Sequence, residues 1–168
     1  TYEKLLQDFG SKYYRRYKKL EPSSSGVVFY WGINRSFPEL GLHNIFFSRD
    51  YRKEFHQLFR EKNLTDDPTV YINITSKHSP DDAPEGCENW YVMVNAPADS
   101  GQDWDQDIAI CRQRILDKIK ALTGMAIQDK IRTEDIWSPP GIASRTSSHR
   151  GALYGSSSNN RFAAFLRH

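Results

Sequence analysis

Hydrophobic and polar residues alternate in several short runs along the chain, and these runs predict the strands of a sheet. Residues 27–34 (VVFYWGIN) form a nearly continuous aromatic and β-branched run, which is typical of a buried strand. Residues 43–48 (HNIFFS) predict a second strand, and residues 127–133 a further one. Residues 69–75 (TVYINIT) and 89–95 (NWYVMVN) flank a Pro- and Gly-bearing loop, so we expect them to pair as antiparallel neighbours.

Other segments repeat their apolar residues at helical spacing. Such spacing predicts amphipathic helices over residues 1–20 and 103–124, the second with acidic residues at its start and Gly124 at its end. The expected apolar stripe of that second helix is Ile108, Cys111, Ile115, Ile119 and Leu122. A shorter helix is expected after Ser48, which can cap it, with Asp50 in the first turn. Its expected stripe is Tyr51, Phe55, Leu58 and Phe59.

Beyond residue 138 the pattern becomes irregular. The composition is rich in Ser, Gly and Arg, which predicts a loop that closes with a short helical patch at residues 161–166. The order and spacing of all these elements predict an α+β fold with a mainly antiparallel β-sheet covered by helices. We expect residues 1–143 to form an α+β domain and residues 144–168 to form a separate Gly/Ser-rich segment.

Composition narrows the class of protein. A hydrophobic content of 38% with 13% aromatic residues indicates a globular domain, and a net charge of only +2 gives no support for nucleic-acid binding. Basic residues cluster at residues 12–19 (KYYRRYKK). This cluster indicates either a solvated helix face or a peripheral contact with anionic lipid. Cys87 and Cys111 are expected to be reduced thiols in the cytoplasm. No apolar run approaches the roughly 20 residues that span a bilayer.

Several kinds of chemistry find no support in the motifs. Asp103, Asp105 and Asp107 imitate the start of a calcium loop, but Ile108 and Arg114 stand where that loop needs glycine and a bidentate carboxylate. The histidines show no pair at metal-ligand spacing, so no metal site is expected. The chain has no nucleophile elbow of the G-x-S-x-G type, so the sequence does not support hydrolase chemistry.

Residues 149–155 (HRGALYG) are the strongest candidate for a binding segment. Gly151 and Gly155 flank a small, an apolar and an aromatic residue, which allows the backbone to approach a flat ligand closely. Arg150 adds a cation and Tyr154 a stacking face. Without other information, a Gly-rich surface turn explains the same pattern.

Five segments, in order, resemble the carotenoid (phytoene-type) desaturases, which are flavoenzymes of the amine-oxidase-like group. They are KYYRRYKKLEPSSSGVVFYWGIN, HNIFFSRDYRKEF, DPTVYIN, APEGCENWYVMVNAP and HRGALYGSSSNNRFAAFLR. The resemblance implies the substrate domain of such an enzyme, with residues 144–168 leading back toward an FAD domain. In that family FAD takes a hydride as hydrogen is removed from a polyene C–C bond.

The resemblance also implies roles for individual residues. The junction between flavin and substrate would be lined by Arg150, Gly151, Ala152, Leu153, Tyr154 and Gly155. Aromatic residues of the strands would supply the sheet and the tunnel wall, although alternation lets only about half of them face one side. They are Phe29, Trp31, Phe46, Phe47, Tyr71, Trp90 and Tyr91. No catalytic residue can be assigned.

The chain also departs from the family pattern. It has no G-x-G-x-x-G fingerprint, begins at Thr1 and ends soon after the last matching segment, so we expect an interior piece that is inactive and binds no FAD alone. The alternatives are a piece of a related retinoid- or lipid-acting flavoprotein, a lipid- or membrane-interaction module, and a plain α+β module whose aromatic residues are all core.

Overall fold

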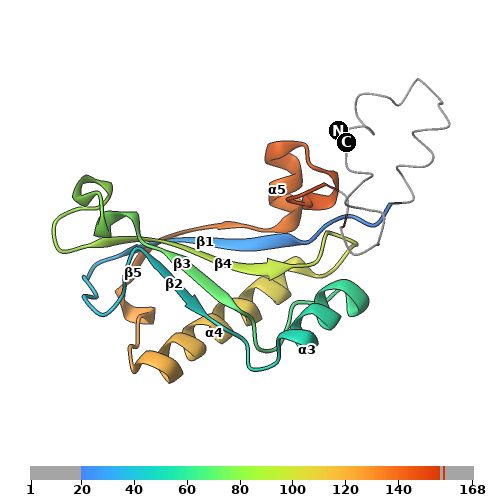
Figure 1. The fold of residues 1–168 in the computed structure, drawn as a ribbon. Helices are drawn as coiled ribbons and strands as arrows, with labels where there is room; N and C mark the ends of the chain where they lie inside the picture. The colour runs from blue at the N-terminus through green and yellow to red at the C-terminus, as the bar shows by residue number, and fades with distance from the viewer. Residues whose placement is uncertain (1–19, 156, 158–168) are drawn as a thin grey trace.

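The centre of the fold is an antiparallel sheet. The computed structural model describes residues 20–155 and 157, and their sheet has the strand order β2–β3–β4–β1–β5 (Figure 1). The strands are β1 (Ser25–Ile33), β2 (His43–Phe46), β3 (Val70–Asn73), β4 (Glu88–Ala96) and β5 (Ile131–Trp137). The helices are α3 (Tyr51–His56), α4 (Trp104–Thr123) and α5 (Pro139–Thr146). Helices α3 and α4 lie on one side of the sheet and α5 on the other, which confirms the predicted α+β class.

The predicted strand pairing is also confirmed. β3 and β4 are antiparallel neighbours, with Val70 opposite Val94 and Ile72 opposite Val92. The last strand begins later than expected, because Gln128–Lys130 form a 3₁₀ turn before β5 starts at Ile131. Ile127, which was expected to begin that strand, is buried in the core instead.

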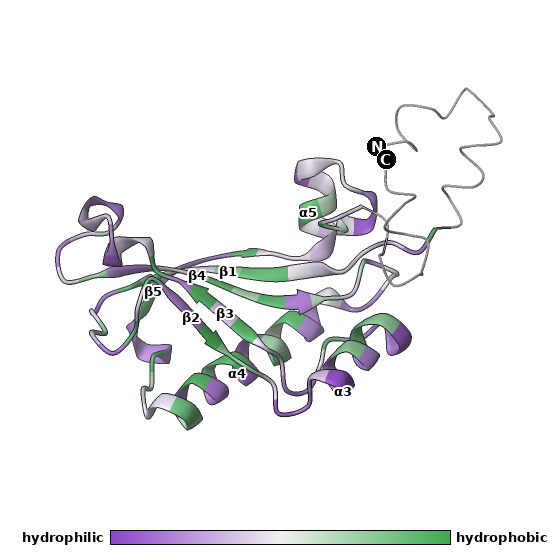
Figure 2. Ribbon diagram, viewed as in Figure 1, coloured by the Kyte–Doolittle hydropathy of each residue, from purple (hydrophilic) through white to green (hydrophobic). Residues whose placement is uncertain are grey.

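The core lies between the sheet and α4. Alternate residues of β1 and β4 are buried in this core, together with Cys111, Ile115 and Ile119 of the helix. Figure 2 shows α4 lying along the sheet with hydrophobic positions on both elements. Ile108 packs at the edge of this core, but Leu122 does not belong to the buried stripe. Leu122 is 61% exposed, whereas Leu116, one turn and a half earlier, is buried. The expected stripe was therefore wrong at its C-terminal end, where the helix extends past the sheet.

Helix α4 has the predicted caps. The Asp103 side chain accepts a hydrogen bond from the Gln106 amide, and Asp105 and Asp107 lie in the first turn. Gly124 ends the helix with a φ of 74°, a conformation that costs glycine little. The acidic residues thus lie at the positive end of the helix dipole, where negative charge stabilises the helix.

Helix α3 differs from the prediction in its cap and in its buried face. Asp50, and not Ser48, is the N-cap, because its carboxylate accepts from the Lys53 amide at 2.9 Å. The amide of Ser48, which follows β2, instead donates to Oγ1 of Thr69, which precedes β3. The helix and the π-helical turn that follows (Gln57–Glu61) bury Glu54, Gln57 and Leu58. Of the expected stripe only Leu58 is fully buried, and the rings of Tyr51, Phe55 and Phe59 contact one another at tilted angles along the helix.

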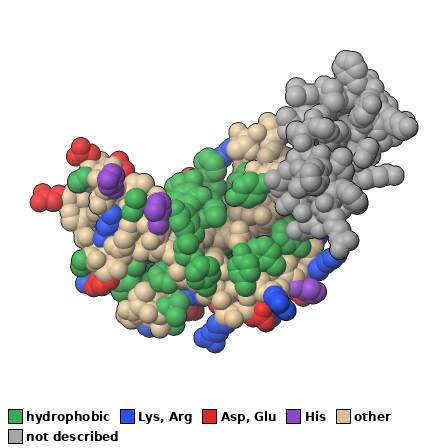
Figure 3. All heavy atoms as spheres, in the orientation of Figure 1, with side chains coloured by type: hydrophobic (Ala, Val, Ile, Leu, Met, Phe, Trp, Pro, Cys, Tyr) green, Lys and Arg blue, Asp and Glu red, His purple; other side chains and the backbone are tan. Residues whose placement is uncertain are grey.

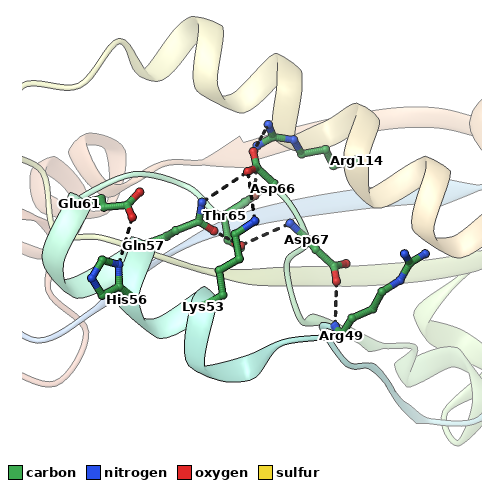
Figure 4. Close-up of polar contacts among 9 residues, drawn as sticks. All are labelled: Arg49, Lys53, His56, Gln57, Glu61, Thr65, Asp66, Asp67 and Arg114. Atoms are coloured by element: carbon green, nitrogen blue, oxygen red, sulfur yellow. Dashed lines mark hydrogen bonds and ion pairs between the residues drawn. The ribbon is translucent and has the colours of Figure 1, made fainter.

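A polar network ties α3 to α4 through the loop at Thr65–Asp67 (Figure 4). Thr65 Oγ1 donates to Gln57 Oε1, and Arg114 of α4 donates to the Thr65 carbonyl and to the Asp66 carboxylate. These bonds explain why polar residues lie on the inner side of the short helix: they hold the loop before β3 in place.

Residues 139–146 form a helix where the sequence predicted a loop. Ser138 caps α5 by accepting from the Gly141 amide, and Pro139 stands at the first helical position, where its missing N–H costs nothing. Ile142 is the buried anchor of the helix. The Ser-Pro-Pro-Gly sequence is thus the start of a helix, where the sequence analysis predicted that a loop begins.

Some expectations concern parts of the chain outside the described residues. These are the helix over residues 1–20, the basic run at residues 12–19 and the helical patch at residues 161–166. Among the helices of residues 20–155, none combines the length and the apolar character that crossing a bilayer requires.

Candidate functional site

The sheet face away from α4 carries two rows of side chains that cross all five strands. The strand register places Ile45, Tyr71, Met93, Val28 and Trp137 side by side in one row, the apolar row. The next row, the polar row, consists of His43, Asn73, Tyr91, Tyr30 and Asp135. With neighbouring strands roughly 4.8 Å apart, each row runs for about 19 Å across the sheet.

Aromatic rings connect the two rows. Tyr91 meets Tyr30 edge to face at a centroid distance of 5.5 Å, and Tyr71 at 6.2 Å. The Tyr91 hydroxyl donates to Met93 Sδ at 3.4 Å, which links the polar row to the apolar row. Burial raises the pKa of Tyr91 above its ordinary value, and the neighbouring phenols of Tyr30 and Tyr71 add to this shift. Tyr91, in the middle of the face, is therefore uncharged as well as aromatic.

Helix α5 covers only one end of the apolar row. Val28 is buried beneath it, and Arg145 lies 4.5 Å over the ring of Trp137. Toward β2 the row is open, and Ile45 is 52% exposed. In the space-filling view, hydrophobic side chains gather over the middle of the sheet beside α5 (Figure 3). The result is an elongated apolar surface that is open toward β2 and bounded by α5 at its other end.

A concave region of about 580 Å³, the polar groove, adjoins the apolar row. It is lined by Tyr30, Gly32, Asn73, Tyr91, Thr133 and Asp135, among others. Gly32 forms part of the groove because it has no side chain, and a Cβ there would collide with Thr133 Oγ1. Tyr30 and Tyr91 of the polar row line the groove and separate it from the apolar row.

The predicted binding segment, residues 150–155, runs along the start of β1. Ser25 Oγ donates to the Gly151 carbonyl at 2.6 Å, and the Leu153 amide donates to Ser24 O at 3.1 Å. Two further bonds join Ser23 to the backbone of Tyr154 and Gly155. The serine run at residues 23–25 therefore fixes this loop beside the sheet.

The two glycines of this segment have different surroundings. Gly151 has a φ of 71° and packs against the Pro139 carbonyl of α5, where a Cβ would collide. Gly155 has a φ of 74° and open space around it. The close approach that Gly151 permits is thus made by the protein's own backbone, while Gly155 remains accessible from outside.

The loop meets the open face of the sheet. The Leu153 side chain reaches Gly26, the cross-strand partner of Asn95, and the Tyr154 phenol is near enough to contribute to the raised pKa of Tyr91. Arg150, Leu153, Tyr154 and Gly155 are exposed, whereas Gly151 and Ala152 are buried beneath them. Of the six residues predicted to bind a cofactor, four can thus touch a ligand directly and two support the loop; binding itself stays a prediction.

The register divides the aromatic residues that were expected to line a tunnel. Phe29, Trp31 and Trp90 face the core under α4, and Phe46 packs at its edge. Tyr71 and Tyr91 lie on the open face, and Phe47 is exposed beyond the end of β2. Sequence reasoning missed Tyr30, Ile45 and Met93, which only the alternation from a known register assigns to that face. Within the described ranges, no three His, Cys, Asp or Glu side chains gather into a group that could hold a metal ion.

Comparison with known proteins identifies the class to which this arrangement is similar. No family model matches the chain. Over all 168 residues the chain is 54% identical to a 1-hydroxycarotenoid 3,4-desaturase from Flavobacterium sp. (strain P99-3), of which it covers 34%.

Over 156 residues, or 92% of the chain, it is 34% and 36% identical to 4,4'-diaponeurosporene oxygenases from Staphylococcus haemolyticus (strain JCSC1435) and Staphylococcus aureus (strain MRSA252). It covers 31% of each oxygenase, so the chain spans about a third of the length of the curated relatives it matches. The predicted resemblance to the carotenoid desaturases is confirmed over this stretch.

Proposed function

We propose that this chain is the substrate-binding portion of an FAD-dependent carotenoid desaturase. The observation that carries the proposal is the apolar row, which crosses all five strands on the open face of the sheet and meets the loop at residues 150–155. Its similarity to a carotenoid desaturase over the whole chain supports the same conclusion.

The chemistry of the open face suits a polyene. Such a molecule is long, flat and without polar atoms along most of its length, and it is driven from water onto apolar surface. The apolar row supplies that surface for about 19 Å, the width of five neighbouring strands. A charged side chain in this row would remain unpaired against hydrocarbon, which is costly. Because polyenes partition into bilayers, we also propose that the protein works in the cytoplasm at the periphery of a membrane.

The exposed part of the loop fits one side of a flavin. Arg150, Leu153, Tyr154 and Gly155 offer a cation, an apolar side chain, an aromatic face and accessible backbone, and Gly151 and Ala152 are buried beneath them. FAD bound there would accept the hydride removed from the polyene. The role of the chain is to orient the polyene beside this loop and to keep water from it through Leu153 and Tyr154.

A matched pair of variants tests the proposal in the longer protein that would contain this chain. Ile45→Lys places a charge in the apolar row, and Ile110→Lys places one on the outer side of α4; the two isoleucines are 52% and 39% exposed. We expect Ile45→Lys to lower the rate of polyene desaturation at least tenfold and Ile110→Lys to leave it unchanged. The measurement is the red shift of polyene absorbance with FAD present and substrate in liposomes. Equal rates for both variants would refute the assignment of this face.

The relatives named as oxygenases support a second candidate, oxidation of the polyene by addition of oxygen. The higher identity to the desaturase favours removal of hydrogen. Mass spectrometry separates the two reactions, because a desaturated product loses two hydrogen atoms whereas an oxygenated product gains an oxygen atom.

A further inference from the structure

Helix α3 and the π-helical turn after it carry a row of aromatic rings on their outer surface. Tyr51, Phe55 and Phe59, the aromatic row, repeat at four-residue spacing, with ring centroids 4.5 Å apart for the first pair and 5.8 Å for the second. Tyr51 is 53% exposed, and Phe47, in the segment that leads into the helix, is 66% exposed. In the space-filling view, hydrophobic side chains are exposed over α3, and Lys and Arg side chains lie beside them (Figure 3).

A row of basic residues runs next to the aromatic row. Arg52, His56 and Arg60, the basic row, each follow one of the aromatic residues by one position, so they repeat at the same spacing on the adjacent side of the helix. All three side chains are exposed. Within the residues that the structure describes, the guanidinium groups of Arg52 and Arg60 form no ion pair.

The acidic side chains of the same helix are engaged elsewhere. Glu54 is buried, and its carboxylate accepts from Thr69 Oγ1 at 2.7 Å. Glu61 pairs with His56, with 3.0 Å between Oε1 and Nδ1, and the Asp50 carboxylate caps the first turn. The charges of the two arginines are therefore left for a partner outside the helix, and that partner is expected to be anionic.

The aromatic row adjoins the surface proposed to bind the polyene at both of its ends. At one end, Phe59 lines a small pocket together with Ser24 and Arg150, beside the loop at residues 150–155. At the other end, Phe47 directly follows β2, whose Ile45 forms the open end of the apolar row. A polyene that leaves a bilayer at α3 would therefore reach the open face of the sheet without crossing charged surface.

We propose that the aromatic and basic rows of α3 dock the protein on a bilayer that contains anionic lipid. Aromatic rings are favoured at the level of the lipid headgroups, and arginine is attracted to anionic phosphates there. This inference rests on the proposed function and deepens it, because it identifies the surface at which the polyene passes from the membrane to the protein. The docking surface is separate from the basic run at residues 12–19.

The first test measures co-sedimentation of the longer protein with phosphatidylcholine vesicles, with and without phosphatidylglycerol. Arg52→Gln removes one charge from the basic row, and Arg35→Gln removes one from the loop after β1, where Arg35 is also exposed. We expect Arg52→Gln to weaken binding to the anionic vesicles about fivefold, the usual contribution of one arginine near such a surface. Binding to the neutral vesicles is expected to stay unchanged, and Arg35→Gln to alter neither.

The second test concerns the aromatic row. Tyr51→Ala removes an exposed ring from α3, and Leu122→Ala shortens a side chain at the end of α4; the two residues are 53% and 61% exposed. Tyr51→Ala is expected to weaken binding to both kinds of vesicle about threefold, because insertion of a ring does not depend on lipid charge. Leu122→Ala is expected to bind like the unmodified protein.

The outcomes separate this inference from the proposed function. Vesicle binding that Arg52→Gln and Tyr51→Ala leave unchanged would overturn the inference. If Tyr51→Ala lowers the melting temperature of the longer protein without changing vesicle binding, another part of that protein covers the row, and the inference is again overturned. Conversion of the polyene is measured separately in detergent micelles, where both variants are expected to match the unmodified protein. Failure of the unmodified protein to convert the polyene there would contradict the proposed function, whatever the vesicles show.

Discussion

Glu88, at the start of β4, is a buried carboxylate surrounded by donors. It accepts hydrogen bonds from the Phe37 amide at 2.8 Å, Ser36 Oγ at 2.9 Å and Trp90 Nε1 at 2.8 Å, and Lys77 Nζ lies 2.6 Å away. We expect Glu88→Gln to lower the free energy of unfolding by about 2–4 kcal/mol, because Lys77 loses its buried counter-ion. Urea denaturation measures this, with Glu85→Gln in the exposed loop as the control. A cost below that of the control variant would show that the four donors contribute little.

The same carboxylate predicts a pH dependence. Burial alone would raise the pKa of Glu88, but the bonds from Lys77, Phe37, Trp90 and Ser36 outweigh it and hold the pKa below the ordinary 4.5. The stabilisation is then fully present above pH 4.5 and is lost as the pH falls through the lowered pKa. The difference in unfolding free energy between the unmodified chain and Glu88→Gln is expected to be constant above about pH 5.5 and to shrink in more acidic buffer. A difference that stays constant down to pH 3 would contradict this.

The two cysteines are expected to differ in reactivity. Cys111 is buried in the core, and burial raises the pKa of its thiol to about 12. Cys87 is partly exposed in the loop before β4. Because only the thiolate reacts, iodoacetamide at pH 8 is expected to alkylate Cys87 and leave Cys111 unmodified until the chain unfolds. Peptide mass spectrometry with and without denaturant reads the two sites separately. Early labelling of Cys111 would mean that the core opens locally around α4.

At the level of elements, predictability follows how strongly local sequence determines the structure. The bounds of helix α4 were predicted almost to the residue, because Asp103 and Gly124 cap it and its buried residues recur at helical spacing from Trp104 to Ile119. Helix α5 was missed, because its Pro-Pro-Gly start has the same composition as a loop and its only buried anchors are Pro139 and Ile142. The stripe of α3 was misread for a different reason. Gln57 accepts a hydrogen bond from Thr65, and Glu54 accepts two from Thr69. These long-range hydrogen bonds explain why two polar residues lie on the buried side of the helix.

The junction between α5 and the loop at residues 150–155 gives a prediction at the same scale. Gly151→Ala would force a Cβ into the Pro139 carbonyl at a positive φ, so we expect a loss of about 2–4 kcal/mol in unfolding free energy. Gly155→Ala meets only the conformational cost of its φ of 74°, about 1 kcal/mol, because no atom of the described residues lies within contact distance. Paired urea titrations measure both. Equal costs would show that Gly151 does not depend on its contact with α5.

On the scale of the whole molecule, the sequence predicted the sheet and the family resemblance but not the site surface. The alternation within β1 or β4 divides residues into two faces without saying which face a helix covers. That choice follows from the register and from the packing of α4, which bury Phe29 and Trp90 and leave Tyr30 and Tyr91 on the open side. The groove depends further on three strands that meet at Gly32, residues distant in sequence that no local motif brings together.

The last prediction concerns flavin binding by the 168-residue chain expressed alone. The sequence holds no G-x-G-x-x-G fingerprint, whose backbone would receive the pyrophosphate of FAD at a helix N-terminus. The loop at residues 150–155 offers a contact on one side only, through Arg150, Leu153, Tyr154 and Gly155. We therefore expect no saturable quenching of FAD fluorescence by the isolated chain up to about 100 μM, a range that would reveal binding of about −5.5 kcal/mol or tighter.

The matched comparison is the longer protein that we propose contains this chain, which is expected to purify yellow and to lose its flavin only on unfolding. A cooperative thermal melt of the isolated chain establishes that it is folded during the titration. Saturable binding at micromolar FAD by the folded chain would place the main flavin contacts within these 168 residues. The loop beside β1 would then be the principal site of the cofactor, and its contact with α5 through Gly151 would be the feature that shapes it.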